Sequence, residues 1–234
     1  MAGEANTGGI LSETFAILTD NARDAALFVL VVGGLSAFGV LSGFYEPDTT
    51  SMDVGFMLGG ETTPANGAFE LIAFVVYIVA GYLLSKRFLA SRNRLGTSGN
   101  RFWQYLGMAI LAGLGIVLGM VLLFVPGLIL LTRWTAATGF AIGAQRGPVE
   151  ALTASWHATK GHGWAIFFAG LVLLIGLIAV LATVAGGISA IDMMAGMVIA
   201  SFLEAVMNTA TYAFAIAVFV LVSNEGENLQ EVFS

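Results

Sequence analysis

The two histidines are the first residues to consider for chemistry, because an imidazole can serve as a general base or as a metal ligand. His157 and His162 both lie in the segment GPVEALTASWHATKGHGW, residues 147–164. They are five positions apart, whereas neighbours on one helix face are about four apart, and Gly161 is expected to end the helix between them. The chain has no cysteine, and no phosphate-binding loop or G-x-S-x-G segment occurs. We therefore expect no metal, no cofactor and no catalytic residue, in a protein that is not an enzyme.

Three further ionisable residues fall inside apolar stretches, namely Glu70, Arg133 and Glu204. Placing such a residue within a spanning helix costs roughly 2.5–3.5 kcal/mol, so each is a candidate functional residue. In the topology derived below, all three lie at a similar height, with Arg133 able to contact both carboxylates. The trio then forms a binding pocket for an anion or lipid headgroup, or it is structural, either as a buried ion pair that fixes helix register or with an arginine that extends outward to the interface. Both interpretations stay open at this point.

The composition is that of an integral membrane protein. Of the 234 residues, 58% are hydrophobic and 10% are charged, whereas soluble domains carry about 25% charged residues. Several apolar runs exceed the ~18 residues that indicate a membrane-spanning helix. The apolar stretch 103–145 is too long for one crossing, and Pro126 and Gly127 form a turn signal that divides it. We predict a single all-α transmembrane domain over 1–234, with spans at about 24–44, 67–88, 103–124, 128–145, 163–185 and 197–222.

Two segments are predicted to lie at the membrane surface as amphipathic helices. Residues 10–22 place Ile10, Leu11, Phe15 and Leu18 on one helical face. Residues 148–160 place Val149, Leu152 and Trp156 on one face, opposite Glu150, Thr153, His157 and Lys160. Within the last span, a polar stripe of Asn208, Thr209, Thr211 and Tyr212 is interpreted as hydrogen-bonded packing, with a cavity lining as the alternative.

The basic residues determine the orientation. Six spans place eight of the nine on one side: Arg23, Lys86, Arg87, Arg92, Arg94, Arg101, Arg146 and Lys160. The opposite loops, 45–66, 125–127 and 186–196, contain no Lys or Arg, and the first carries Glu46, Asp48, Asp53 and Glu61. The positive-inside rule then predicts cytoplasmic N- and C-termini. The N-terminus has no basic segment ahead of an apolar core, so we expect no cleaved signal peptide.

Glycines recur at four-residue spacing within the predicted spans, as Gly39 with Gly43, Gly115 with Gly119, and Gly139 with Gly143. Small residues at this spacing let helices approach closely in lipid. The pairs indicate packing within the bundle, with association of two copies as the alternative.

The segment from Pro126 to Gly163 resembles the glycerophosphoryl diester phosphodiesterase membrane-domain family. That family has a Pro-Gly turn, a span with an early arginine, and a motif E-A-L-x-x-S-W-x-x-T-K-G before the next span. The matching residues are Pro126, Gly127, Arg133, Glu150, Ala151, Leu152, Ser155, Trp156, Thr159, Lys160 and Gly161. The sequence departs from the family at Gln145, where an acidic residue is common.

The resemblance implies a bacterial inner-membrane module without the separate soluble domain that carries phosphodiesterase activity in fused members. The leading hypothesis is a non-enzymatic envelope protein that binds or organises lipid, because Arg133 offers a charged pocket and the loop 86–101 is basic. A small transporter or permease is the alternative, and an oligomeric scaffold is a second one. The expected partners are membrane lipids and a membrane protein or second copy, not nucleic acid.

Overall fold

The computed structural model describes residues 5–44, 64–97 and 99–233, and these residues are helical with short connections. The acidic residues of the predicted loop 45–66, Glu46, Asp48, Asp53 and Glu61, lie outside the described residues. The described helices are α1 (Thr7–Asp20), α2 (Ala22–Leu41), α3 (Pro64–Ser91), α4 (Phe102–Leu122), α5 (Phe124–Arg133), α6 (Ala137–Ile142), α7 (Pro148–Ala158), α8 (Gly163–Ser189) and α9 (Met193–Phe233).

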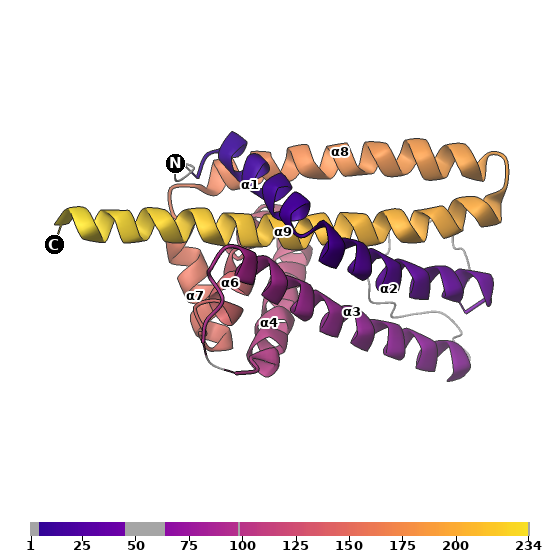
Figure 1. The fold of residues 1–234 in the computed structure, drawn as a ribbon, viewed down its shortest axis with the longest axis horizontal. Coiled ribbons are helices and arrows are strands. Elements are labelled where there is room, and N and C mark those ends of the chain that lie inside the picture. Colours follow the sequence, from indigo (N-terminus) through magenta and orange to yellow (C-terminus); the bar gives the residue numbers. More distant parts are fainter. Residues whose placement is uncertain (1–4, 45–63, 98, 234) are drawn as a thin grey trace.

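Four long helices, α2, α3, α8 and α9, lie side by side along a common direction (Figure 1). Helix α9 is central, since 67% of its apolar window is buried, against 28% or less in the other long apolar helices. Alanines on its buried face, such as Ala213 and Ala217, allow the neighbouring helices to approach. The start of α1 and the end of α9 lie toward the same end of this bundle.

Five helices, α2, α3, α4, α8 and α9, are long and apolar enough to cross a membrane. They correspond to five of the six spans predicted from the sequence, with boundaries that differ by a few residues. The prediction of an all-helical, multi-pass membrane protein is therefore confirmed at this coarser level.

The fourth predicted span, 128–145, is not one helix. It falls across α5, which ends at Arg133, and α6, which begins at Ala137. Residues Ala137, Ala141 and Ile142 of this stretch are buried in the protein core. A high hydropathy shows only that a residue avoids water. These residues avoid water by packing against other helices of the protein, so their hydropathy does not indicate a membrane span. The preceding turn also differs from the predicted one at 125–127: α4 ends before Leu123, and Pro126 lies in the first turn of α5, where a missing N–H costs little.

Helices α1 and α7 each bury one face against the rest of the described protein. In α1 the buried residues are Ile10, Thr14 and Ile17, while Phe15 is 57% exposed. In α7 they are Ala151, Leu152 and Ser155. Contact with the membrane surface stays a prediction for both helices.

Arg92, just after α3, fastens α1 to the end of α3. Its guanidinium donates to Glu13 at 2.5 Å and to Asp20 at 2.6 Å. Partial burial acts to lower the pKa of Arg92, but the hydrogen bonds to Asp20 and Glu13 outweigh it and raise that pKa. Asn21 adds a hydrogen bond to Ser91 at 2.9 Å. The N-terminal helix is thereby held beside the basic loop that connects α3 to α4.

Candidate functional site

The structure places Arg133 at the end of α5, beside the beginning of α8. A Cβ position on Gly163 would lie 3.9 Å from the guanidinium carbon of Arg133. In the antiparallel α8–α9 pair, Gly170 faces Phe214, so Glu204 is level with about residue 180 of α8. At 1.5 Å per residue, Glu204 is about 25 Å from Arg133 along the pair. The structure therefore does not bring Arg133 together with Glu204.

Glu70 and Glu204 do share a level. Helices α3 and α9 run in the same direction, because the Tyr77 hydroxyl donates to Asn208 Oδ1 at 3.3 Å and Tyr212 packs against Gly81. Glu70 lies two turns before Tyr77, and Glu204 lies one turn before Asn208. Arg133 is at the other end of the bundle, so the predicted three-residue pocket does not form.

The polar stripe of α9 is used largely for packing. The hydroxyls of Thr209 and Thr211 donate to the carbonyls of Ala205 and Met207, one turn back in the same helix. Asn208 accepts from Tyr77. These bonds satisfy the polar groups locally, in agreement with the packing interpretation.

Arg133 takes part in a reciprocal contact between two helix ends. The Arg133 carbonyl, at the end of α5, accepts from the Ser155 hydroxyl at 2.7 Å, and the Thr159 hydroxyl lies 3.2 Å away. In return, the Arg133 guanidinium donates to the Thr159 carbonyl, just past the end of α7, at 2.6 Å. Carbonyls at helix C-termini lack partners within their own helix. Here the Arg133 carbonyl receives the Ser155 hydroxyl, and the Thr159 carbonyl receives the Arg133 guanidinium in addition to the His162 N–H. We call these three residues the Arg133 junction.

The other residues of the predicted motif build α7 and its ends. The Glu150 carboxylate accepts from the Gly147 N–H at 3.1 Å and thereby caps the first turn. Gly161 has φ +96°, a conformation that favours glycine after a helix. Trp156 lies 5.6 Å from the Arg133 guanidinium carbon in a cation–π geometry. Lys160 is exposed. The motif thus coincides with one structural unit, the Arg133 junction and the helix that supports it.

Pro126 and Gly127 belong to a different contact. A Cβ on Gly119 of α4 would lie 2.9 Å from the Gly127 Cα, so the two backbones touch. This is close packing within one chain, as predicted for Gly119.

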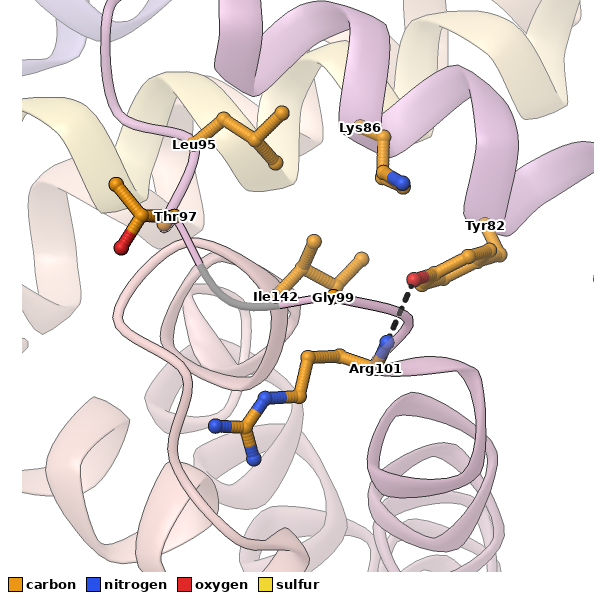
Figure 2. A pocket seen from close by; sticks show the side chains of 8 residues that line it. Tyr82, Lys86, Leu95, Thr97, Gly99, Arg101 and Ile142 are labelled. Carbon is orange, nitrogen blue, oxygen red and sulfur yellow. Dashed lines mark hydrogen bonds between the residues drawn. The ribbon is translucent and has the colours of Figure 1, made fainter.

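A second polar site lies on the basic loop between α3 and α4. A cavity of about 270 Å³ is lined by Tyr82, Lys86, Leu95, Gly96, Thr97, Gly99, Arg101 and Ile142. Figure 2 shows Lys86 and Tyr82 extending from α3 toward the cavity, while the side chain of Arg101, at the end of the loop, extends away from Lys86. None of the lining residues is acidic. We call this the basic cavity.

Tyr82 fixes the shape of the basic cavity. Its hydroxyl accepts from the Arg101 backbone N–H at 2.9 Å and donates to Asn100 Oδ1 at 3.0 Å (Figure 2 draws the first bond). The Lys86 ammonium lies 5.6 Å from the centre of the Tyr82 ring. At the start of the loop, Arg94 donates to Asn224 of α9. Hydrogen bonds therefore anchor described residues of the loop on both sides of the cavity.

The two cations of the basic cavity differ from their basic neighbours. Arg87 is 3.8 Å from Asp24, and Arg92 pairs with Glu13 and Asp20. Within the described part of the chain, Lys86 and Arg101 form no ion pair. Both cations are therefore available to an anion, and both line the same cavity.

The sequence identified this loop as basic but did not identify a cavity. The glycines of the segment LGTSGN were the available signal, since they permit a tight loop over the side chains of α3. Metal-ligand side chains do not gather in groups of three in the described ranges. His157 is exposed on α7 and lines a shallow groove together with Phe140, Arg146 and Glu150.

Comparison of the chain with protein-family models, with curated proteins and with solved structures finds no match. The resemblance to the phosphodiesterase membrane-domain family stays a prediction from the motif residues.

Proposed function

We propose that this chain is a non-enzymatic membrane protein that binds the anionic headgroups of lipids at the basic cavity. The observation that carries the proposal is the pair Lys86 and Arg101, two cations without an ion-pair partner among the described residues, at a preformed cavity without a carboxylate. The expected role in lipid binding thus moves from Arg133, which is engaged in its junction, to the loop at 86–101.

The size of the cavity favours a headgroup over a whole lipid. Its volume of about 270 Å³ falls below the range of ~300–1,000 Å³ typical of pockets that enclose drug-sized ligands. A phosphate-bearing headgroup fits such a space, while its acyl chains stay outside among the exposed apolar side chains of the neighbouring helices. Each Lys or Arg close to an anionic surface contributes ~1 kcal/mol to binding.

The surroundings also suit a membrane boundary. Trp103, two residues after Arg101, is 74% exposed, and Trp164 at the start of α8 is 75% exposed. Tryptophans with this exposure are typical of the interface between headgroups and acyl chains. We place this end of the bundle in the cytoplasm of a bacterium, with both termini on that side of the inner membrane, because the basic residues gather there.

The proposal is tested by the retention of phosphatidylglycerol, measured by native mass spectrometry of protein released from nanodiscs at 0.15 M ionic strength. The double variant Lys86→Ala with Arg101→Ala is expected to retain about tenfold less lipid, which corresponds to ~1.4 kcal/mol. Phosphatidylcholine, which has no net charge, is expected to be retained equally by both proteins.

The matched control is Arg23→Ala with Arg87→Ala, which removes the same charge from two exposed residues outside the cavity. Arg87 lies 3.8 Å from Asp24, so its charge is already partnered and is expected to contribute less than Lys86 to a lipid in the cavity. Equal losses in the two double variants would reduce the effect to overall charge and overturn the proposal. So would unchanged retention in the cavity variant.

Transport is the second candidate, favoured by the break between α5 and α6 at 134–136. Broken helices form binding sites in many transporters. Here the break packs against α7 through the Arg133 junction. Lipid-headgroup flux in proteoliposomes that is abolished by Arg133→Ala, in protein that remains folded, would favour transport over binding.

A further inference from the structure

The hairpin formed by α4 and α5 is the largest apolar feature that the basic cavity does not use. No charged residue occurs between Arg101 and Arg133. Helix α4 is apolar on all sides beyond its first two turns, and α5 folds back along it with Gly127 against Gly119. The sequence pattern is that of two spanning helices joined by a short loop.

The hairpin is hardly covered by the rest of the described protein. Only 11% of the apolar window of α4 is buried, although its mean hydropathy of 2.3 exceeds the value of 2.0 for the central helix α9. The tip is the most exposed part, with Val121, Leu122, Leu123, Phe124 and Val125 between 62% and 78% exposed. Uncharged side chains with this exposure require an apolar environment outside the described protein.

Both ends of the hairpin are held at the same end of the bundle. At the beginning of α4, Phe102 and Tyr105 pack on Tyr82 of α3, near the basic cavity. At the end of α5, the Arg133 junction ties the chain to α7 and to the start of α8. Helix α5 has ten residues, which is about 15 Å. That length is half of the ~30 Å apolar layer of a bilayer.

The direction of the hairpin also differs from that of the other apolar helices. Figure 1 shows α4 running across α9, whereas α2, α3 and α8 lie alongside it. A bilayer that contains the four aligned helices as spans therefore does not contain α4 as a parallel fifth one.

The backbone of the turn suits an apolar layer. Leu123 is its one extended residue, and the Leu123 N–H donates to the Gly119 carbonyl at 3.1 Å. Pro126 has no N–H to satisfy, so few donors at the tip lack a partner. Unsatisfied backbone groups are costly in lipid, and this turn keeps their number small.

We infer that α4 and α5 form a re-entrant hairpin, which enters and leaves the bilayer on the side of α7 and inserts its tip among the acyl chains of that leaflet. The chain then crosses the membrane four times, through α2, α3, α8 and α9. Because the hairpin replaces two crossings, the basic loops and both termini keep the side predicted from six spans. The partner of the exposed tip is lipid, and the inference does not depend on the basic cavity.

The absence of cysteine from the sequence allows a direct test. Phe124→Cys at the tip is compared with Ile191→Cys, which lies 90% exposed in the turn between α8 and α9, and with Lys160→Cys near the end of α7. Six spans place Phe124 and Ile191 on the same side of the membrane, whereas a re-entrant hairpin does not. Labelling with a charged, membrane-impermeant maleimide in spheroplasts reports access from the side of Ile191, and inverted vesicles report the other side.

We expect Ile191→Cys to be labelled in spheroplasts and Lys160→Cys in inverted vesicles. Phe124→Cys is expected to react to at most about a tenth of the Ile191→Cys level in spheroplasts, because hydrocarbon excludes the charged reagent. Labelling in SDS shows that the thiol is reactive, and a bimane on Phe124→Cys is expected to be quenched by lipids with a spin label in the acyl chain.

Labelling of Phe124→Cys in spheroplasts at the Ile191→Cys level would overturn the inference in favour of six spans. A disulfide between two Phe124→Cys chains in native membranes, without quenching by the lipid label, would assign the tip to a second copy and overturn it as well. Neither result depends on the retention of anionic lipid.

Discussion

Arg133 and the pair Lys86 and Arg101 are cations at the same end of the bundle, but their surroundings differ. The Arg133 guanidinium donates to the Thr159 carbonyl and faces the Trp156 ring. The Lys86 ammonium lies over the face of Tyr82, and neither it nor Arg101 has an ion-pair partner in the part of the chain that the structure describes. The first cation completes a helix end, and the other two border a cavity.

This difference teaches that a charged residue within an apolar segment is not by itself a ligand site. Arg133 stands out in the sequence because its charge is costly in lipid, yet the cost is offset by two helix ends that need hydrogen-bond partners. Lys86 and Arg101 do not stand out in the sequence, because basic residues are common in such a loop. They become candidates because neither forms an ion pair among the described residues. The comparison can be tested by substituting these residues and measuring stability and lipid retention separately for each variant.

The largest expected effect is on stability, from Arg133→Ala. The variant removes a charge-assisted hydrogen bond, so we expect a loss of about 1.5–3 kcal/mol in the free energy of unfolding. The thermal midpoint in mild detergent, followed by tryptophan fluorescence, measures it, and Arg133→Lys is expected to recover part of the loss. Retention of phosphatidylglycerol per folded molecule is expected to stay unchanged. A stable Arg133→Ala protein that no longer retains the lipid would reverse the roles assigned to the two regions.

Ser155→Ala tests the reciprocal half of the junction and is expected to cost about 1 kcal/mol, the typical value for one hydrogen bond. Combined with Arg133→Ala, it is expected to cost less than the sum of the two single effects, because both residues hold the same pair of helix ends. Strictly additive losses in this double-mutant cycle would show that the two bonds act independently.

Arg92→Ala provides an intermediate case, since its cation is paired but lies outside the apolar segments. Loss of its contacts with Glu13 and Asp20 is expected to destabilise the protein by about 0.5–1 kcal/mol, and by less at high salt. The thermal midpoint measured at two ionic strengths checks this. A loss equal to that of Arg133→Ala, independent of salt, would contradict the distinction drawn between the two arginines.

The smallest expected effect on stability belongs to Lys86→Ala with Arg101→Ala. The hydrogen bond from Arg101 to Tyr82 uses the backbone N–H, so both substitutions leave it in place. We expect a change within about 0.5 kcal/mol, as for surface residues in general, together with the loss of lipid retention described above. A strongly lowered thermal midpoint would show that these cations are structural.

The spans could be predicted because a helix of about twenty consecutive apolar residues matches the thickness of the hydrocarbon core of a bilayer. The stretch that failed, 128–145, shows the limit of this argument. Ala137, Ala141 and Ile142 are apolar because they face other helices, and hydropathy gives lipid and protein the same value. A break in such a stretch depends on partners elsewhere in the chain, here Ser155 and Thr159.

For the candidate sites too, local sequence indicated the residues but not their tertiary partners. The motif residues Glu150, Ser155 and Trp156 lie together on α7, but the pairing of their helix with the end of α5 is a tertiary contact with no periodic signal. The basic loop was visible as a run of charges. The cavity depends on the Tyr82 hydroxyl, which holds Arg101 in place, and nothing in the spacing of these residues indicates that bond.

The Arg133 junction also has a consequence for biosynthesis. The groups that cap the end of α5 are 22 and 26 residues further along the chain. At translation rates of ~5–20 residues per second, the donors leave the ribosome roughly one to five seconds after Arg133 does. During that interval the uncapped end of α5 and its arginine must be accommodated by water or by the insertion machinery. We therefore expect the end of α5 to become fixed only after α7 has emerged.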